Sequence, residues 1–217
     1  MKKKFYNDRE ERLSWVFRRF KREFKESKSI LDIGCDNKQL KKYVSNKKYL
    51  GIDMTENADK VINLDEISKL PFKSNSFDLI VCTDVLEHLE NFHLIFDEIC
   101  RVANKYVIIT LPNPVISFFG YFFKIKTRKD NGQFGKFSKY YGLPLEKPLD
   151  RHRWFFCYDE VVDFLKYKSK KKKFKIKSIE TDYEYRSRNI LKKIVLFIVY
   201  KINRNFVYND IVILIEK

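Results

Sequence analysis

The sequence of 217 residues predicts a doubly wound α/β fold with a mostly parallel, seven-stranded sheet. Seven short apolar segments alternate with polar or amphipathic connections, which is typical of parallel strands joined by right-handed crossovers. The first segment, residues 30–33, runs into Gly34, and the second ends at Asp53. A glycine turn after one buried strand and a carboxylate after the next are typical of a sheet that binds a nucleoside at its switch point.

An amphipathic helix is expected at residues 9–27, because apolar side chains recur there at three- and four-residue spacing. Further helices are predicted at residues 91–102, 158–167 and 190–203. The predicted strands are residues 30–33, 49–52, 61–64, 77–82, 106–111, 174–181 and 210–215, the last two closing the sheet as a hairpin-like pair.

This order predicts two parts along the chain. Residues 1–28 form an N-terminal amphipathic helix, and residues 29–217 form the α/β domain. The rhythm of strands and helices breaks after the fifth strand. Residues 113–157 are therefore expected to be a helical or loop insertion that forms a lid or substrate wall at the carboxyl edge of the sheet.

Charge is concentrated in two places. The formal net charge is +16, with eight lysines and no acidic residue in 166–177 and eleven basic against five acidic residues in 2–28. Such clusters favour a polyanion or an anionic membrane surface, and a lysine-rich loop without a partner is the alternative. The four cysteines lack metal-site spacing, which indicates reduced core thiols in a cytoplasmic protein. The charge clusters allow a location at the periphery of a membrane as well.

Five motifs follow one another between residues 28 and 112. They are Leu31-Asp32-Ile33-Gly34-Cys35, Gly51-Ile52-Asp53, Leu70-Pro71-Phe72 with Phe77-Asp78, Asp84-Val85-Leu86-Glu87-His88-Leu89, and the strand Tyr106–Leu111 with Pro112-Asn113. Together they resemble the class I S-adenosylmethionine-dependent methyltransferases, the small Rossmann-like methyltransferase domains. The resemblance implies a Rossmann-like sheet, S-adenosylmethionine as cofactor and methyl transfer as the reaction.

The resemblance also assigns cofactor-binding residues. Asp53 corresponds to the ribose ligand, and Thr83 lines the methyl-transfer site. Asp65, or alternatively Asn63, stands where the family contacts adenine. The full set of cofactor-binding residues it implies is Asp32, Gly34, Cys35, Asp53, Met54, Asp65 and Thr83.

One position departs from the family pattern. The family usually has Gly-Cys-Gly-x-Gly in the first loop, whereas this chain has Gly34-Cys35-Asp36-Asn37-Lys38. Family members with Gly-Asn-Lys or Gly-Asp-Lys in this loop exist, so only Asp36 is unusual. Aspartate tolerates a left-handed backbone better than most residues, so the turn can survive. A non-catalytic domain that has kept the fold is the alternative.

Asp84, Glu87 and His88 share one face if they open a helix. Two carboxylates and an imidazole suit Mg²⁺ or Mn²⁺. The pattern resembles the metal element of ubiquinone-pathway O-methyltransferases and of small-RNA 3′-terminal 2′-O-methyltransferases, in which case His152 is the further ligand. The alternative, favoured here, is that no metal binds and that Glu87 and His88 pack behind the substrate pocket.

Residues 150–156 combine arginines with Trp154 and aromatic neighbours. They are either an acceptor-site element that binds an anionic group or a segment whose rings dock on the core. His88 and His152 are the expected catalytic bases, since histidine titrates near neutral pH.

The predicted activity is methylation of an oxygen or nitrogen acceptor on a small molecule or a lipid- or glycan-linked substrate. The apolar segment at residues 115–125 and the lysine-flanked helix at 190–200 suit a peripheral membrane contact or ordinary core burial. An RNA 2′-O-methyltransferase-like enzyme fits the charge but is not favoured, because no RNA-binding signature is visible. A catalytically silent partner protein is the third alternative.

Overall fold

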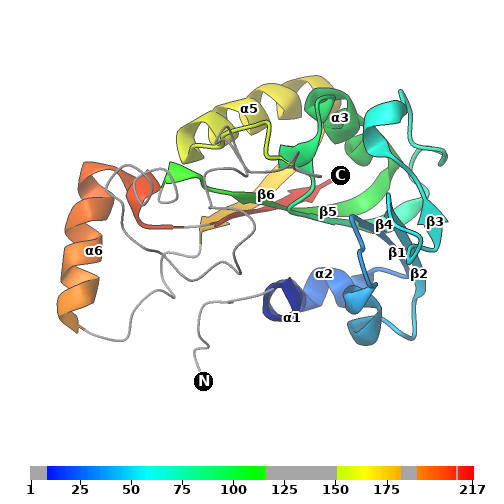
Figure 1. Ribbon diagram of the computed structural model, residues 1–217, viewed down its shortest axis with the longest axis horizontal. Helices are drawn as coiled ribbons and strands as arrows, with labels where there is room; N and C mark the ends of the chain where they lie inside the picture. The colour runs from blue at the N-terminus through cyan, green and yellow to red at the C-terminus, as the bar shows by residue number, and fades with distance from the viewer. Residues whose placement is uncertain (1–8, 116–150, 182–189, 209) are drawn as a thin grey trace, which may run out of the picture.

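The computed structural model describes residues 9–115, 151–181, 190–208 and 210–217. Figure 1 shows a central sheet with helices on both of its faces. The strands are β1 Ser29–Ile33, β2 Lys48–Asp53, β3 Lys60–Val61, β4 Phe77–Thr83, β5 Ala103–Pro112, β6 Lys175–Thr181 and β7 Asp210–Glu216. The helices are α1 Arg9–Arg19, α2 Lys21–Glu26, α3 Phe92–Val102, α5 Tyr158–Lys172 and α6 Ile190–Ile202. Short 3-10 turns are η1 Gln39–Tyr43, η2 Leu64–Glu66, η3 Leu86–His88 and η5 Arg204–Phe206.

The sheet order is β3-β2-β1-β4-β5-β7-β6. The strands from β1 to β5 pair in parallel, and β7 runs antiparallel to both β5 and β6. The chain order reverses between β1 and β4, which makes the gap between these two strands the switch point of the sheet. The predicted doubly wound, mostly parallel, seven-stranded sheet is confirmed.

The core lies in two layers, because successive residues of a strand point to opposite faces. In β5, Val107 and Ile109 join the layer under α3 and α5, whereas Ile108 joins the layer over α1 and α2. Figure 1 shows α3 and α5 above the sheet and α1 and α2 below it. The N-terminal segment is thus one layer of the domain, with Phe20 and Phe24 fully buried against the sheet.

Several predicted bounds are corrected by the structure. The single helix expected at residues 9–27 breaks at Phe20, whose backbone (φ −107°, ψ 33°) is not helical, into α1 and α2. The strand expected at 61–64 shrinks to Lys60–Val61, and Leu64 begins a 3-10 turn instead. The lysine run is not a long loop: α5 continues through Lys172, Lys173 caps it with a left-handed backbone, and β6 begins at Lys175. Lysine has good helix propensity, so apolar periodicity is not needed for α5 to extend.

Most of the insertion expected at 113–157 lies outside the described residues. None of the helices within the described ranges is long and apolar enough to cross a membrane.

Candidate functional site

The turn after β1 requires glycine. Gly34 has φ +74°, and a Cβ added there would lie 2.1 Å from Cγ2 of Val85. Gly34 N and Cys35 N both donate hydrogen bonds to Ile52 O, at 2.9 and 3.2 Å. Only glycine combines a left-handed backbone with this close approach. The turn therefore brings the loop after β1 against the end of β2.

Asp53 lies at the end of β2 and faces that loop. Its Oδ2 accepts a hydrogen bond from Asp36 N at 2.8 Å, and its Oδ1 accepts one from Thr55 N at 3.2 Å. A carboxylate offers about four acceptor sites, so both oxygens retain capacity for ribose hydroxyls. Asp36 itself has φ 46°, so aspartate takes the left-handed backbone that was expected at this position. The departure from the family pattern leaves the loop folded.

Asp32 is buried at the carboxyl end of β1 and accepts a hydrogen bond from Tyr49 Oη at 2.7 Å. Burial is the main reason that the pKa of Asp32 rises to about 7. Burial likewise raises the pKa of Cys35 to about 12, so this thiol is not a nucleophile at neutral pH. Of the other predicted cofactor contacts, Thr83 is buried at the end of β4, whereas Met54 is 69% exposed.

The helix expected to carry Asp84, Glu87 and His88 on one face does not form. Asp84 has φ 52°, and the 3-10 turn η3 begins only at Leu86. The Asp84 carboxylate turns toward β5, where it accepts a hydrogen bond from Thr110 Oγ1 at 2.6 Å, and it forms an ion pair with Arg12 of α1. Asp84 is therefore separated from Glu87 and His88.

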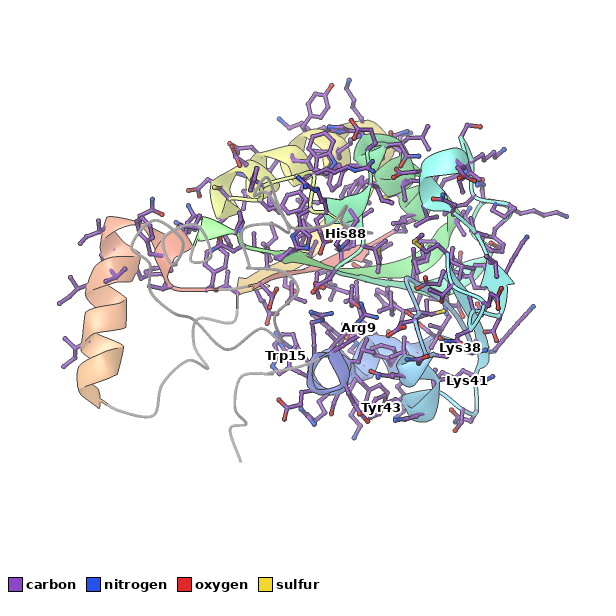
Figure 2. The ribbon with its side chains drawn as sticks, in the orientation of Figure 1. Arg9, Trp15, Lys38, Lys41, Tyr43 and His88 are labelled. Atoms are coloured by element: carbon purple, nitrogen blue, oxygen red, sulfur yellow. The ribbon has the colours of Figure 1, made fainter. Side chains whose placement is uncertain are left out.

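Arg9 and Arg12 are residues that sequence reasoning missed. Arg9 pairs with Asp36 at 2.5 Å and Arg12 pairs with Asp84, so α1 contacts the loops after both β1 and β4. These are the two strands that flank the switch point. In Figure 2, Arg9 lies below the sheet on the side of α1, and His88 lies above it. The alternating acids and bases of residues 8–12 gave no signal for this contact, because surface helices often carry such a pattern.

Glu87, His88 and His152 come together above the sheet. His88 Nε2 lies 3.6 Å and His152 Nε2 lies 4.0 Å from Oε1 of the fully buried Glu87. The two imidazole rings meet edge to face, 4.5 Å between centroids. Together these side chains offer one carboxylate and two imidazoles whose ligand atoms lie within 4.8 Å of one another. We call these three residues the Glu-His-His cluster.

A backbone contact brings His152 to the cluster. Arg153 N donates a hydrogen bond to Glu87 O at 2.7 Å, and Trp154 Nε1 donates one to Leu89 O at 2.5 Å. The Trp154 ring packs 5.5 Å from the ring of Phe92 on α3. For Trp154, the geometry supports docking on the core over stacking on an acceptor.

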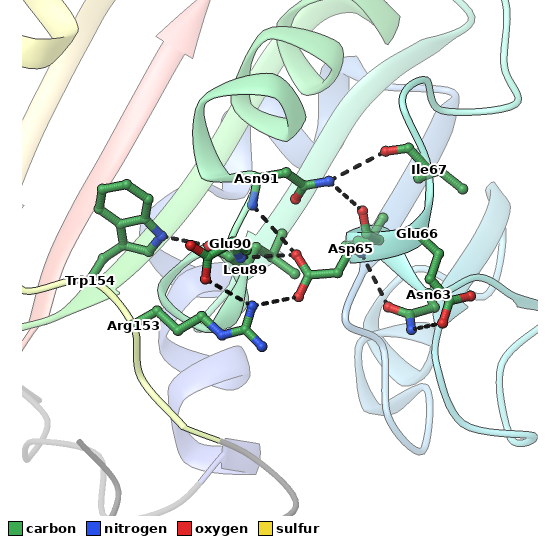
Figure 3. A network of polar contacts seen from close by, with 10 residues as sticks. Asn63, Asp65, Glu66, Ile67, Leu89, Glu90, Asn91, Arg153 and Trp154 are labelled. Carbon is green, nitrogen blue, oxygen red and sulfur yellow. Dashed lines mark hydrogen bonds and ion pairs between the residues drawn. The ribbon is translucent and has the colours of Figure 1, made fainter. Parts of the chain in front are cut away.

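Arg153 and Asp65 link this segment to the loop after β3. Arg153 Nη1 lies 3.1 Å from Asp65 Oδ2 and 3.3 Å from Glu90 Oε2 (Figure 3). Asp65 Oδ1 also accepts a hydrogen bond from Glu90 N at 2.9 Å, and Asn63 Oδ1 accepts one from Asp65 N at 3.2 Å. An adenine contact from Asp65 or Asn63 stays a prediction. What the structure adds is that Asp65 joins the loops after β3 and β4 to the segment that carries His152.

Comparison with known proteins agrees with this architecture. Residues 31–109 match the methyltransferase domain family. A solved S-adenosylmethionine-dependent methyltransferase from Archaeoglobus fulgidus is similar with a TM-score of 0.61 and 17% identity, covering 98% of this chain and 96% of that one. Magnesium protoporphyrin IX methyltransferase from Synechocystis, solved with bound SAH, gives a TM-score of 0.57 and 13% identity, covering 96% and 83%.

Two further proteins are similar to this chain. The methyltransferase domain of bacterial-CtHen1-C is similar with a TM-score of 0.57 and 13% identity, covering 95% of this chain and 97% of that one. An uncharacterized protein of Methanocaldococcus jannaschii is 33% identical over 101 residues. That match spans 44% of each chain, so this chain aligns with less than half of its curated relative. The expected resemblance is confirmed: the chain has the fold of the class I S-adenosylmethionine-dependent methyltransferases, and its residues 31–109 match the methyltransferase domain family.

Proposed function

We propose that this protein is an active methyltransferase that moves a methyl group from S-adenosylmethionine to an oxygen or nitrogen acceptor on a small molecule or on a lipid- or glycan-linked substrate. One observation carries the proposal. Glu87 and His88 of the Glu-His-His cluster follow β4, and the Asp53 carboxylate ends β2, with only β1 between these strands. A cofactor anchor and a group able to take a proton thus stand at one edge of the sheet.

The loop after β1, which carries Gly34, and the end of β2, which carries Asp53, form the cofactor half of the proposed site, and their geometry is suited to bind a ribose. Asp53 is held by two backbone N–H groups and keeps acceptor capacity for both hydroxyls of a ribose. Gly34 lets the loop after β1 pack directly against Val85, which holds that loop at the same edge as Asp53. Bound S-adenosylmethionine supplies a methyl group that is already activated on a positively charged sulfur.

In this proposal His88 is the base that removes a proton from the acceptor. Its side chain is 21% exposed, whereas Glu87 and His152 are buried at 0% and 5%, so His88 is the member of the cluster that an acceptor can reach. A histidine is suited to remove a hydroxyl or ammonium proton near neutral pH. Glu87 then stabilises the protonated imidazole through charge, and the His152 ring fixes the orientation of His88.

A divalent metal is the alternative use of the cluster. With Asp84 bound elsewhere, the donor set is one carboxylate and two imidazoles rather than the two carboxylates expected from sequence. This set suits Mn²⁺, Fe²⁺ or Zn²⁺ better than Mg²⁺. Glu87, His88 and His152 would hold the ion, which would lower the pKa of an acceptor hydroxyl.

A second candidate function is RNA 2′-O-methylation. It is favoured by the Glu-His-His cluster, which resembles the metal element of small-RNA 3′-terminal 2′-O-methyltransferases, and by the net charge of +16. The acceptor would then be a ribose hydroxyl at an RNA end.

Cofactor binding is tested first. Calorimetry with S-adenosylhomocysteine should detect binding to the wild-type protein and at least about tenfold weaker binding to Asp53→Asn, since hydrogen bonds to a charged group contribute about 1.5–3 kcal/mol. Asp78→Asn is a matched control, because Asp78 lies at the opposite end of β4 and accepts a hydrogen bond from Lys28 N. Absence of binding to the wild type would favour the silent partner protein instead.

Turnover is tested next with methyl-labelled S-adenosylmethionine and separate lipid, glycan, RNA and small-molecule fractions. His88→Ala should lower labelling by about 100-fold while leaving S-adenosylhomocysteine binding intact. Loss of labelling with EDTA, restored by Mn²⁺, assigns the cluster to a metal; insensitivity to EDTA leaves His88 as the base. Full turnover by both His88→Ala and His152→Ala would remove the cluster from the mechanism.

A further inference from the structure

α6 stands apart from the two layers of the domain. It connects β6 to β7 and, in Figure 1, lies beyond the sheet rather than on either face. Among the described elements its main neighbour is η5, the turn that follows it. Among the residues that the structure describes, α6 is therefore a helix outside both core layers.

The exposed face of α6 is apolar. Ile194, Phe197, Ile198 and Ile202 have three- and four-residue spacing, so they form one stripe. Their exposed fractions are 52%, 53%, 53% and 77%. These four residues, which we call the α6 stripe, are half of the eight large apolar side chains exposed among the described residues. A concentration of this kind on one helix marks a contact surface rather than scattered surface residues.

The segment of the sequence that contains the α6 stripe carries only basic charge, which indicates an anionic partner. From residue 185 to residue 209 the sequence has six basic residues and no acidic one; these are Arg186, Arg188, Lys192, Lys193, Lys201 and Arg204. Lys201 is exposed, and its Nζ lies 5.5 Å from the centre of the Phe197 ring, so a positive charge borders the apolar stripe. A helix with an apolar face and only basic charges fits a surface that is apolar beneath and anionic above.

The base of α6 is fixed to the sheet. Arg204 stacks over Tyr158 at 4.6 Å from the ring centre. Asn205 O accepts a hydrogen bond from Asn113 Nδ2 at 2.6 Å, and Asn205 Oδ1 accepts one from Tyr158 N at 3.0 Å. Asn113 follows directly after β5, at the edge of the sheet where the Glu-His-His cluster lies after β4. A surface bound by α6 would therefore lie next to this edge.

We propose that α6 binds the interface of an anionic lipid bilayer, with the α6 stripe inserted among the acyl chains and Lys201 at the head groups. The inference concerns binding only and holds whether or not the proposed methyl transfer is correct. It also places the carboxyl edge of the sheet at the membrane.

The test uses the full chain and vesicles of two compositions, phosphatidylcholine alone and an equimolar mixture with phosphatidylglycerol. In co-sedimentation the wild type should bind the mixed vesicles much more strongly than the neutral ones. Phe197→Ser combined with Ile198→Ser should weaken binding by at least about tenfold, because two apolar side chains no longer enter the bilayer. Val61→Ser is the matched control, since Val61 is 56% exposed on β3 and should leave vesicle binding unchanged.

Thermal unfolding and sedimentation complete the test. The double variant should unfold at the wild-type temperature, as expected for exposed residues. Equal vesicle binding by variant and wild type, or no preference for anionic vesicles, would overturn the proposal. So would a marked loss of thermal stability, which would mean that protein covers the stripe, or a wild-type dimer that the variant abolishes, which would assign the stripe to a second copy of the chain.

Discussion

The two halves of the candidate site are built differently. The cofactor half, made by the loops after β1 and β2, is held by bonds between short neighbouring motifs: Gly34 N to Ile52 O and Asp36 N to Asp53 Oδ2. The acceptor half depends on the C-terminal end of the insertion, residues 151–157, which brings His152 within 4.0 Å of Glu87.

The difference lies in what each half needs in order to form. Parallel pairing of β1 with β2 is enough to bring Gly34 and Asp53 to one edge. The Glu-His-His cluster needs, in addition, the docking of residues 151–157 on α3. Local motifs therefore form the proposed cofactor half, and long-range packing forms the proposed acceptor half.

Phe92→Ala should break the acceptor half. The Phe92 ring is 5% exposed and packs against Trp154, Phe156 and Phe164 at 5.4–5.6 Å. Removing a buried phenylalanine costs about 3–5 kcal/mol, measured here as the free energy of unfolding in urea. Leu94→Ala on the same helix is the control and should cost less than about 1 kcal/mol, because Leu94 is 36% exposed. A small loss for Phe92→Ala would show that the 151–157 segment does not depend on this contact.

Gly34→Ala should break the cofactor half. The new Cβ would overlap with Val85, and alanine is strained at φ +74°, so we expect a loss of about 2–3 kcal/mol in unfolding free energy and weaker binding of S-adenosylhomocysteine. Adding Val85→Ala should relieve the overlap and recover part of the loss, with the backbone strain remaining. Wild-type affinity in Gly34→Ala would contradict the assigned role of the turn.

Asp32 should make stability depend on pH in a defined direction. Burial raises its pKa in the folded protein to about 7, so the folded state holds a proton that the unfolded chain, with a pKa near 3.9, releases. Stability from this group is complete below about pH 4 and is lost as the pH rises through 7, with a slope of at most about 1.4 kcal/mol per pH unit. The stability of the wild type, measured by thermal unfolding between about pH 4 and 7, should fall with pH relative to that of Asp32→Asn by up to this slope. Parallel plots of stability against pH for the two proteins would refute the prediction.

Arg153→Met should have the smallest effect. The guanidinium is 44% exposed and pairs with Asp65 and with Glu90, which is 80% exposed. Solvent-exposed ion pairs contribute less than about 1 kcal/mol, and methionine retains much of the apolar stem. The backbone hydrogen bond from residue 153 to Glu87 O remains, so His152 should stay in place. The free energy of unfolding in urea measures this small loss. A loss above roughly 2 kcal/mol would show that the ion pairs of Arg153, rather than its backbone hydrogen bond, hold residues 151–157 in place.

The sequence by itself determined the α/β class, the existence of all seven strands, and the positions of Gly34 and Asp53. These features rest on period-two and helical spacing and on turn chemistry, which act over a few residues. The prediction that Asp84 shares a helix face with Glu87 and His88 was wrong. Asp84 has a left-handed backbone, which rotates its side chain away from theirs although the residue spacing is unchanged.

Only the tertiary structure decided that Arg12 pairs with Asp84, that His152 reaches Glu87, and that the apolar face of α6 is exposed whereas those of α1 and α2 are buried. Each depends on which distant segments the sheet order brings together. The spacing of apolar residues is the same in a covered helix and an uncovered one, so periodicity predicts the helix but not what lies against it.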